Sequence, residues 1–144
     1  NLIRADIEVK ALAWAVASAS PGEIDELNIL KASFLAMNRA VNALSLVPEH
    51  LLIDGNRFLN QTGIPHSCIV KGDATFMSVA AASILAKTHR DELMLSLHQD
   101  YPLYNWNKNK GYPTDFHRKA IVHYGISPWH RKSFRLTNGQ LQLW

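Results

Sequence analysis

The chain of 144 residues is 47% hydrophobic and carries a formal net charge of +3. This length suits one domain with a substantial core and leaves too little chain for two. No run of roughly eighteen apolar residues occurs, which excludes a membrane span. A single cysteine, Cys68, excludes an internal disulfide and favours a reducing, cytoplasmic location.

The first part of the chain predicts a strand followed by a long helix. Residues 11–20, ALAWAVASAS, are small and apolar in an alternating pattern, which favours a strand. Ser20, Pro21 and Glu23 then form the pattern of a capping box with a proline in the first turn. Asn28 marks a point where the helix can break. Apolar residues recur at helical spacing beyond the cap: Ile24, Leu27, Leu30, Phe34, Met37, Val41 and Leu44.

The middle and end of the chain predict two strands and two further helices. The short apolar runs LLI and CIV precede Asp54 and Asp73, and a loop rich in Gly, Asn and Pro joins them. A helix is expected over about 76–99, ended by Tyr101-Pro102. Another is expected over about 114–124, capped by Thr114 and closed by Gly125. This order of elements predicts an α/β domain with a mixed sheet.

Asp54 and Asp73 each follow a predicted strand. If the strands are neighbours, both acids project from one edge of the sheet, where α/β folds place ligands. Two such carboxylates need a shared proton or a cation to offset their repulsion, and hard oxygen donors favour Mg²⁺ or Mn²⁺. Ordinary turn and capping chemistry also explains each acid separately. A two-metal site wants three or four carboxylates, so this pair is incomplete.

The charge is distributed unevenly. Residues 101–144 contain seven Lys/Arg against one Asp/Glu, and nine of the thirteen aromatic residues of the chain. Basic residues interleaved with aromatic ones suit a polyanion with stackable bases, which favours nucleic acid. The alternative is a lobe whose aromatic residues form a core while its charges interact with solvent.

Several segments together resemble bacterial ribonuclease HII, the type 2 ribonucleases H. The resemblance runs from about residue 8 to 134 and includes ALAWAVASASPGEIDELNIL, LLIDGNRF, IVKGDATFMSVAAASILAKTHRD and NKNKGYPTDFHRKAIVHYGISPWHRKSF. It implies a ribonuclease H-like α/β fold with a mixed sheet flanked by helices. On this basis we expect a partial catalytic core over 1–100 and a basic, aromatic substrate-binding lobe over 101–144.

The resemblance also implies an activity. The family cuts the RNA strand of RNA–DNA hybrids, including at single ribonucleotides in duplex DNA, with Mg²⁺ or Mn²⁺ held by four acids. Two of these acids correspond to Asp54 and Asp73, as catalytic metal ligands. The other two belong to a D-E-x-G-R-G motif that this sequence lacks. We therefore expect the first two strands to be absent, as in part of a longer chain, leaving the strand over 11–19 without a ladder partner.

Two other interpretations stay open. One is a catalytically inactive module that binds RNA–DNA hybrids, and the other is a different metal nuclease of the same fold, such as a resolvase. A duplex with one embedded ribonucleotide and an all-DNA duplex distinguish the resolvase from the ribonuclease.

The resemblance assigns Tyr112 to substrate reading, stacked on the sugar of the nucleotide after the ribonucleotide. The alternative is a tyrosine packed in its loop with an inward hydroxyl. Pro113 stands where the usual motif has Gly. His117 and His130 match family positions and are expected to be hydrogen-bonded structural residues. Further substrate contacts are expected at Lys108, Lys110, Arg131, Lys132, Arg135, Lys87, Ser83 and Asn56.

The remaining expectations concern partners. The substrate class is RNA–DNA hybrid or DNA that contains ribonucleotides, with no membrane partner, and the protein is expected to be a monomer. Gln140 and Gln142 near Leu143-Trp144 loosely resemble the sliding-clamp motif that some bacterial members carry at the C-terminus.

Overall fold

A computed structural model describes residues 2–134. Internal packing divides the chain into two compact units. The first, called here the strand unit, comprises residues 1–19 and 29–89; the second, the aromatic unit, comprises residues 20–28 and 90–144. This division lies after His89, inside a helix, and differs from the boundary at residue 100 that the sequence suggested. Residues 20–28 pack with the later unit because tertiary contacts, rather than chain order, define a compact unit.

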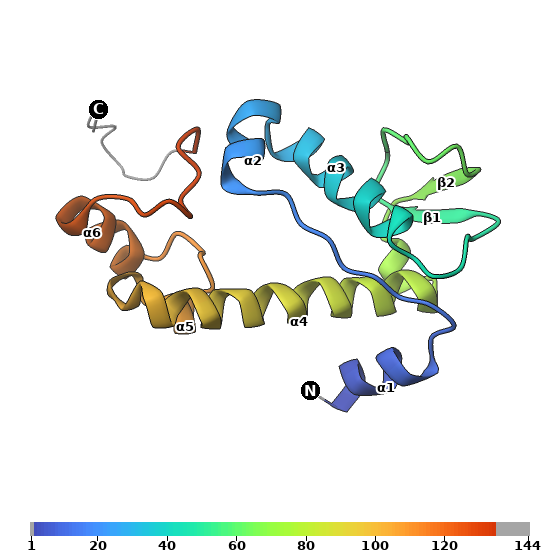
Figure 1. The fold of residues 1–144 in the computed structure, drawn as a ribbon, viewed down its shortest axis with the longest axis horizontal. Coiled ribbons are helices and arrows are strands. Elements are labelled where there is room, and N and C mark those ends of the chain that lie inside the picture. Colours follow the sequence, from blue (N-terminus) through green and yellow to red (C-terminus); the bar gives the residue numbers. More distant parts are fainter. Residues whose placement is uncertain (1, 135–144) are drawn as a thin grey trace. The chain divides into compact units, whose positions relative to one another are not determined.

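The strand unit is built on a small parallel sheet. Strands β1 (Leu51–Asp54) and β2 (His66–Ile69) pair in parallel, with Leu51 opposite His66 and Asp54 opposite Ile69. Helix α3 (Ile29–Asn42) lies beside these strands (Figure 1). A short 3₁₀ turn, η1 (Gly72–Ala74), then leads into helix α4 (Met77–Asp100), whose first half belongs to this unit. The neighbouring strands and the long helix after Asp73 confirm the α/β class.

Alternate residues of β1 form the core of the strand unit. Leu51 and Ile53 are buried while Leu52 faces outward, as the period of two in a strand requires. Ala32 of α3 and Val79 and Leu85 of α4 are the other buried apolar residues of this unit.

A buried asparagine, Asn38, connects α3 to the loop between the strands. Its Nδ2 donates to the carbonyl oxygens of Phe34 (2.8 Å) and Leu59 (2.9 Å). Its Oδ1 accepts from the backbone N–H of Gln61 at 2.8 Å. The side chain thereby satisfies its polar atoms in the interior and holds the loop that leads into β2.

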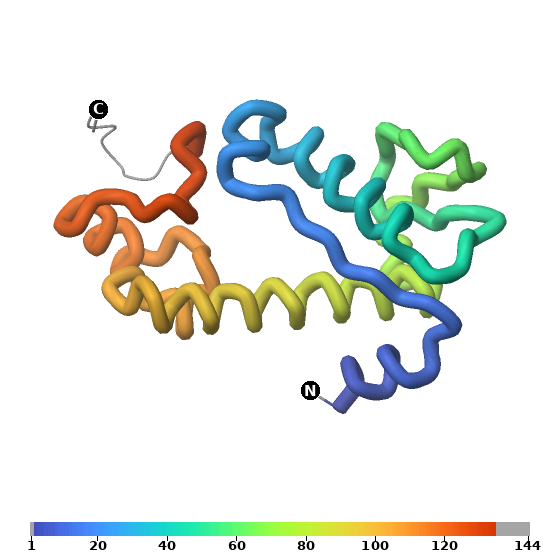
Figure 2. The backbone as a smooth tube through the Cα atoms, viewed as in Figure 1, coloured from blue at the N-terminus to red at the C-terminus, as the bar shows by residue number. Residues whose placement is uncertain are grey.

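The strand predicted over 11–20 is wrong. Residues 13–20 have no regular secondary structure, and the backbone tube runs there without coiling (Figure 2). Half-buried alanines alternate with exposed Trp14, Val16 and Ser18, so the period of two survives. A strand needs a hydrogen-bonded neighbour, and residues 2–134 supply none for this segment. That outcome matches the expectation that the segment lacks a ladder partner.

The helix α1 (Leu2–Lys10) was not predicted. Two pairs of opposite charge at i, i+4 spacing support it: Arg4 Nε to Glu8 Oε1 at 2.6 Å and Lys10 Nζ to Asp6 Oδ2 at 2.9 Å. Such pairs each contribute a few tenths of a kcal/mol. The sequence contains both pairs, as R-x-x-x-E and D-x-x-x-K. The helix was not predicted from them because no apolar stripe at helical spacing accompanies the pairs.

The aromatic unit begins with helix α2 (Pro21–Leu27). Its capping box is confirmed: Glu23 N donates to Ser20 Oγ at 3.2 Å, and Ser20 N donates to Glu23 Oε2 at 2.8 Å. The helix ends at Asn28, which has φ 72° and separates α2 from α3. The break expected at Asn28 is therefore confirmed, because a left-handed φ cannot continue a right-handed helix.

Aromatic and aliphatic residues together form the core of this unit, which includes the second half of α4. Three short helices follow: η2 (Pro102–Tyr104), α5 (Trp106–Asn109) and α6 (Asp115–Tyr124). Thr114 and Gly125 cap α6 as predicted. Within residues 2–134, no helix is long and apolar enough to cross a membrane. The core contains Leu97, Tyr104, Trp106, Ala120 and Ile121.

Candidate functional site

The backbone positions of the two aspartates predicted as metal ligands lie close together in space, although the residues are far apart in the sequence. Asp54 is the last residue of β1, and its Oδ1 accepts a hydrogen bond from the Gly72 N–H at 2.9 Å. Gly72 directly precedes Asp73, which lies in η1, a few residues after β2 ends. Both aspartate side chains are exposed. Parallel pairing of β1 and β2 therefore brings the turn that carries Asp73 to the end of the strand that carries Asp54.

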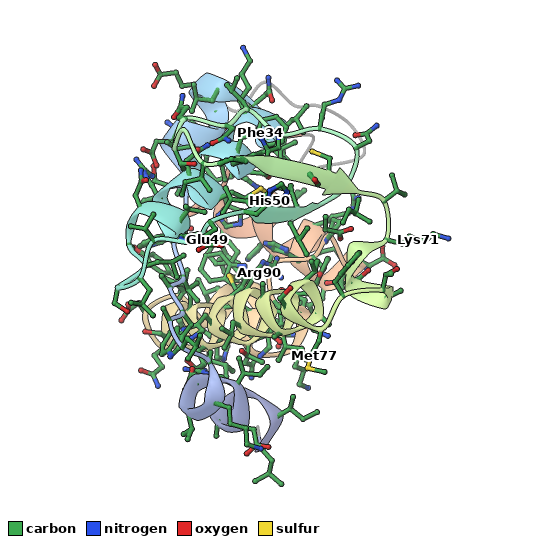
Figure 3. The ribbon with its side chains drawn as sticks, turned by 90° about the vertical axis from the view of Figure 1, so that its right-hand side faces the viewer. Phe34, Glu49, His50, Lys71, Met77 and Arg90 are labelled. Atoms are coloured by element: carbon green, nitrogen blue, oxygen red, sulfur yellow. The ribbon has the colours of Figure 1, made fainter. Side chains whose placement is uncertain are left out.

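The turn between β2 and α4 has a strained start. Lys71 has φ 58° and ψ 41°, a left-handed conformation that costs a residue with a Cβ roughly 1–2 kcal/mol. Its carbonyl oxygen accepts from Ala74 N at 3.2 Å, and the Gly72 carbonyl accepts from Phe76 N at 2.8 Å. Figure 3 shows the Lys71 side chain projecting from this turn, away from the strands. The backbone reversal turns Gly72 N toward Asp54 and leaves Asp73 at the surface.

Other predicted contacts in the strand unit are exposed. Asn56 follows β1, and Ser83 and Lys87 lie one helical turn apart on α4. Among the described residues, none of the three makes a hydrogen bond or ion pair with Asp54 or Asp73. Across all the described residues, there is no group of three or more His, Cys, Asp or Glu side chains that could hold a metal ion. The carboxylate pair is thus present without the further acids that a two-metal site wants.

Tyr112 lies on a tightly bonded loop of the aromatic unit, and the residue is 61% exposed. The loop passes through Lys110 (φ 49°) and Gly111 (φ 80°), two successive left-handed residues. Two hydrogen bonds to Asn109 hold this loop: the Asn109 Oδ1 accepts from Gly111 N, and the Asn109 carbonyl accepts from Tyr112 N, both at 2.8 Å. Within residues 2–134, the Tyr112 hydroxyl has no hydrogen bond, which disfavours the inward-packed alternative.

Arg90 of α4 contacts this loop twice, and the sequence did not single it out as a site residue. Its Nη2 donates to the Lys110 carbonyl at 2.9 Å. Its guanidinium carbon lies 4.9 Å from the centroid of the Tyr112 ring, within cation–π range. Arg90 lies in the K-T-H-R-D segment, but helical periodicity alone cannot show which loop its side chain contacts.

Two buried histidines support the loop from the core, as expected for structural residues. His117 Nδ1 donates to the Tyr112 carbonyl at 3.0 Å, and its Nε2 accepts from Trp106 Nε1 at 3.3 Å. His130 Nε2 lies 3.1 Å from His117 Nε2, and His130 Nδ1 accepts from Ser127 N at 3.0 Å. These partners assign one tautomer to each ring, with both rings neutral and His130 donating to His117.

Burial sets the protonation of this histidine pair. It lowers the pKa of His130 from the ordinary 6.5 to about 4, with the neighbouring His117 adding to the effect. It also lowers the pKa of His117, an effect that the Tyr112 carbonyl opposes. A proton on His130 Nδ1 would face the Ser127 N–H, so the network is stable only while neutral.

The residues predicted to contact phosphates differ in their exposure and in their neighbours. Lys108 is exposed, whereas Lys110 Nζ donates to the Asn107 carbonyl at 2.6 Å. The guanidinium carbon of Arg131 lies 3.7 Å from the centroid of the Phe134 ring. Lys132 is exposed and its backbone N–H donates to Asp25. Arg135 and the residues of the clamp-like pattern, Gln140, Gln142, Leu143 and Trp144, lie outside the described residues.

Asp25 of α2 holds the segment that carries Arg131 and Lys132. Its carboxylate accepts from Lys132 N and Ser133 N, both at 2.8 Å, and from Ser133 Oγ at 2.6 Å. Burial raises the pKa of Asp25, but these hydrogen bonds outweigh it and the net pKa is lowered. No local pattern in the sequence indicates this role, because the partner residues of Asp25 are more than a hundred positions away.

The molecule is thus an α/β protein with Asp54 at the end of β1, Asp73 in the turn after β2, and an exposed Tyr112 on a loop of the aromatic unit. Residues 1–137 match the family model described as Ribonuclease HII. The chain is 61% identical to Ribonuclease HII of Bacteroides thetaiotaomicron over 142 residues, which cover 98% of this chain and 71% of that protein. It is 57% identical to Ribonuclease HII of Phocaeicola vulgatus, again over 98% of this chain and 71% of that protein. The chain belongs to the ribonuclease HII family.

A solved structure supports the same fold. Ribonuclease H2 from Pyrococcus horikoshii OT3 superposes with a TM-score of 0.65 at 24% identity. The alignment covers 82% of this chain and 63% of the Pyrococcus chain. The likeness confirms the ribonuclease H-like fold expected from the sequence.

Proposed function

We propose that the protein cuts the RNA strand of RNA–DNA hybrids, and cuts duplex DNA on the 5′ side of a single ribonucleotide. The observation that carries this proposal is the bond from Gly72 N to Asp54 Oδ1, which brings Asp54 beside the residue before Asp73. Asp54 ends β1, and Asp73 lies in the turn after β2, which supports a shared ligand site near the edge of the sheet where α/β folds place ligands. Membership of the ribonuclease HII family supplies the reaction class.

The donor set fits a hard divalent cation. Asp54 and Asp73 offer exposed carboxylate oxygens, and Mg²⁺ takes one or two carboxylates while keeping sites for water and phosphate. When bound, Mg²⁺ or Mn²⁺ would polarise the phosphodiester and favour attack by water. Residues 2–134 contain no group of three or more candidate metal ligands, so complete two-metal hydrolysis requires acids beyond Asp54 and Asp73.

The chain's own residues bind and orient the substrate. Tyr112 presents an exposed ring for stacking on a sugar, and Lys108 and Lys132 carry exposed positive charge for phosphates. Hydrolysis joins the oxygen of water to phosphorus and breaks the bond from phosphorus to O3′. The departing O3′ takes up a proton. The products are a 3′-hydroxyl and a 5′-phosphate.

The test is a chimera in which this chain replaces the matching region of the Bacteroides thetaiotaomicron protein. We expect it to cut a duplex with one embedded ribonucleotide in Mn²⁺ and to leave an all-DNA duplex intact. Asp54→Asn and Asp73→Asn should each reduce cleavage by about a thousandfold while binding is kept, because a charge-stabilising ligand is lost. Asp100→Asn, on an exposed carboxylate at the end of α4, is the matched control.

Two outcomes would contradict the proposal. Wild-type cleavage by Asp54→Asn would leave Asp54 as a turn residue. Equal cutting of both duplexes would favour a general metal nuclease and would remove the role given to Tyr112.

A second candidate is hybrid binding without cleavage by this chain alone. The lack of any third candidate ligand near the two aspartates among residues 2–134 favours it. Measurements of binding and cleavage by the 144-residue chain test this second candidate. If the chain binds the hybrid without cutting it while the chimera cuts, then this chain alone is a binding module and the activity proposed above needs the additional residues of the chimera.

A further inference from the structure

One guanidinium, that of Arg90, contacts the residues on both sides of Gly111. Its Nη2 donates to the Lys110 carbonyl at 2.9 Å, and its carbon lies 4.9 Å from the Tyr112 ring centroid. A guanidinium can do both, because its edge donates hydrogen bonds while its face stacks on an aromatic ring. An ammonium group is a point charge and lacks the flat face that stacks on a ring while the edge donates.

The loop needs such a support. Lys110 and Gly111 both have left-handed backbones, and the Lys110 conformation is strained for a residue with a Cβ. A Cβ built on Gly111 would lie 3.3 Å from Met94 Cε and 3.9 Å from Arg90 Nη2, so α4 packs directly against the loop. Arg90 is carried by a long helix, which gives the contact a rigid base.

We propose that Arg90 is a positioning residue for substrate reading: it fixes the Lys110–Tyr112 loop and one face of the Tyr112 ring, so that the other face is presented to the sugar. This inference rests on the proposed function for the identity of the substrate. It adds a specific consequence, since Arg90 acts through Tyr112 rather than by its own charge. Loss of Arg90 therefore lowers discrimination more than overall affinity.

Arg118 offers a matched control. Its Nε donates to the carbonyl of Pro113, the residue after Tyr112, at 3.2 Å. Arg118→Ala thus removes the same charge and a comparable bond to the same loop, but leaves the Arg90 guanidinium over the Tyr112 ring. Arg90→Lys is the second variant, since it keeps the charge and the helix while removing the planar fork.

The first measurement needs no nucleic acid. The chain has four tyrosines, so labelling with 3-fluorotyrosine gives four ¹⁹F resonances, and Tyr112→Phe identifies the one from residue 112. We expect Arg90→Ala and Arg90→Lys to move this resonance and Arg118→Ala to leave it in place. An unmoved Tyr112 resonance in both Arg90 variants overturns the inference.

The second measurement is the ratio of affinities of the 144-residue chain for a duplex with one ribonucleotide and for an all-DNA duplex, in Ca²⁺. Arg90→Ala and Arg90→Lys should lower this ratio by about threefold to tenfold, the scale of a cation–π contact plus a hydrogen bond. Arg118→Ala should weaken both duplexes equally. In a Tyr112→Ala background, Arg90→Ala should change the ratio no further, because both act as one unit.

The outcomes separate the two proposals. A wild-type ratio near one contradicts substrate reading by this chain, while the ¹⁹F result still decides whether Arg90 holds Tyr112. A wild-type preference that Tyr112→Ala removes and Arg90→Ala keeps overturns the positioning role alone. Full rescue by Arg90→Lys overturns it as well, because charge would then suffice.

Discussion

The two candidate binding regions of this molecule are built by opposite means. Asp54 and Asp73 lie exposed, and within residues 2–134 their carboxylates accept a single hydrogen bond, from the backbone N–H of Gly72. Tyr112, by contrast, lies on a loop whose backbone is bonded to buried Asn109 and His117. The Tyr112 loop is therefore preorganised by the protein core, whereas the Asp54 and Asp73 side chains lie at the surface without comparable support.

The largest expected effect comes from Trp106, which is 2% exposed and stacks on Tyr104 with ring centroids 5.1 Å apart. Trp106→Ala should lower the free energy of unfolding by about 4 kcal/mol, because it leaves a large cavity and removes the donor to His117. Hydrogen exchange should show the loss in the aromatic unit, with amides of β1 and β2 still protected. Equal loss of amide protection in both units would show that they unfold together, and would contradict a separately stabilised aromatic unit.

A smaller effect is expected from acid. The pKa of His130 is about 4 in the folded protein and near 6.5 when unfolded, so its stabilisation is complete above pH 6.5 and is lost as pH falls toward 4. We expect a loss of about 2 kcal/mol after solvent screening, measured by urea unfolding at several pH values. His130→Gln should flatten this dependence, and His123→Gln, on an exposed residue of α6, should not. An unchanged slope in His130→Gln would contradict the buried neutral pair.

Gly111 and Gly125 allow strain to be separated from contact. Both have a positive φ, 80° and 78°, but only Gly111 has neighbours within 4 Å of an added Cβ. Gly111→Ala and Gly125→Ala should each cost about 1–3 kcal/mol of unfolding free energy in thermal melts, because a residue with a Cβ is strained at such a φ. Only Gly111→Ala should also shift the ¹⁹F resonance of Tyr112. A shift in both variants would mean that the loop is not held locally.

The smallest effect is expected at Lys71, beside the carboxylate pair. Lys71→Gly should stabilise the chain by up to about 1 kcal/mol, because glycine relieves the left-handed strain at a cost in chain entropy. Lys71→Ala keeps the Cβ and should bring no such gain. Denaturant midpoints of the two variants measure the difference. A loss of stability in Lys71→Gly would show that the lysine side chain supports the turn.

Local signals predicted several elements well. The capping box at Ser20, the break at Asn28 and the caps Thr114 and Gly125 all depend on residues within a few positions of one another. Because the partners of such bonds are close in the sequence, the bonds can be predicted from the sequence pattern without knowledge of the tertiary fold. The strand over 11–20 failed for the complementary reason: alternation marks an extended chain, but only a partner strand makes it a strand.

The family and the α/β class could be predicted from the sequence, because both depend on the order and spacing of its segments. The same is true of the positions of Asp54 and Asp73 just after two apolar runs. Only the tertiary structure decided that Arg90 supports Tyr112, that Asp25 caps the turn at Lys132, and that His117 and His130 share one neutral network. Each of these contacts joins residues more than ten positions apart, and side-chain direction after folding, which no local pattern encodes, selects the partner.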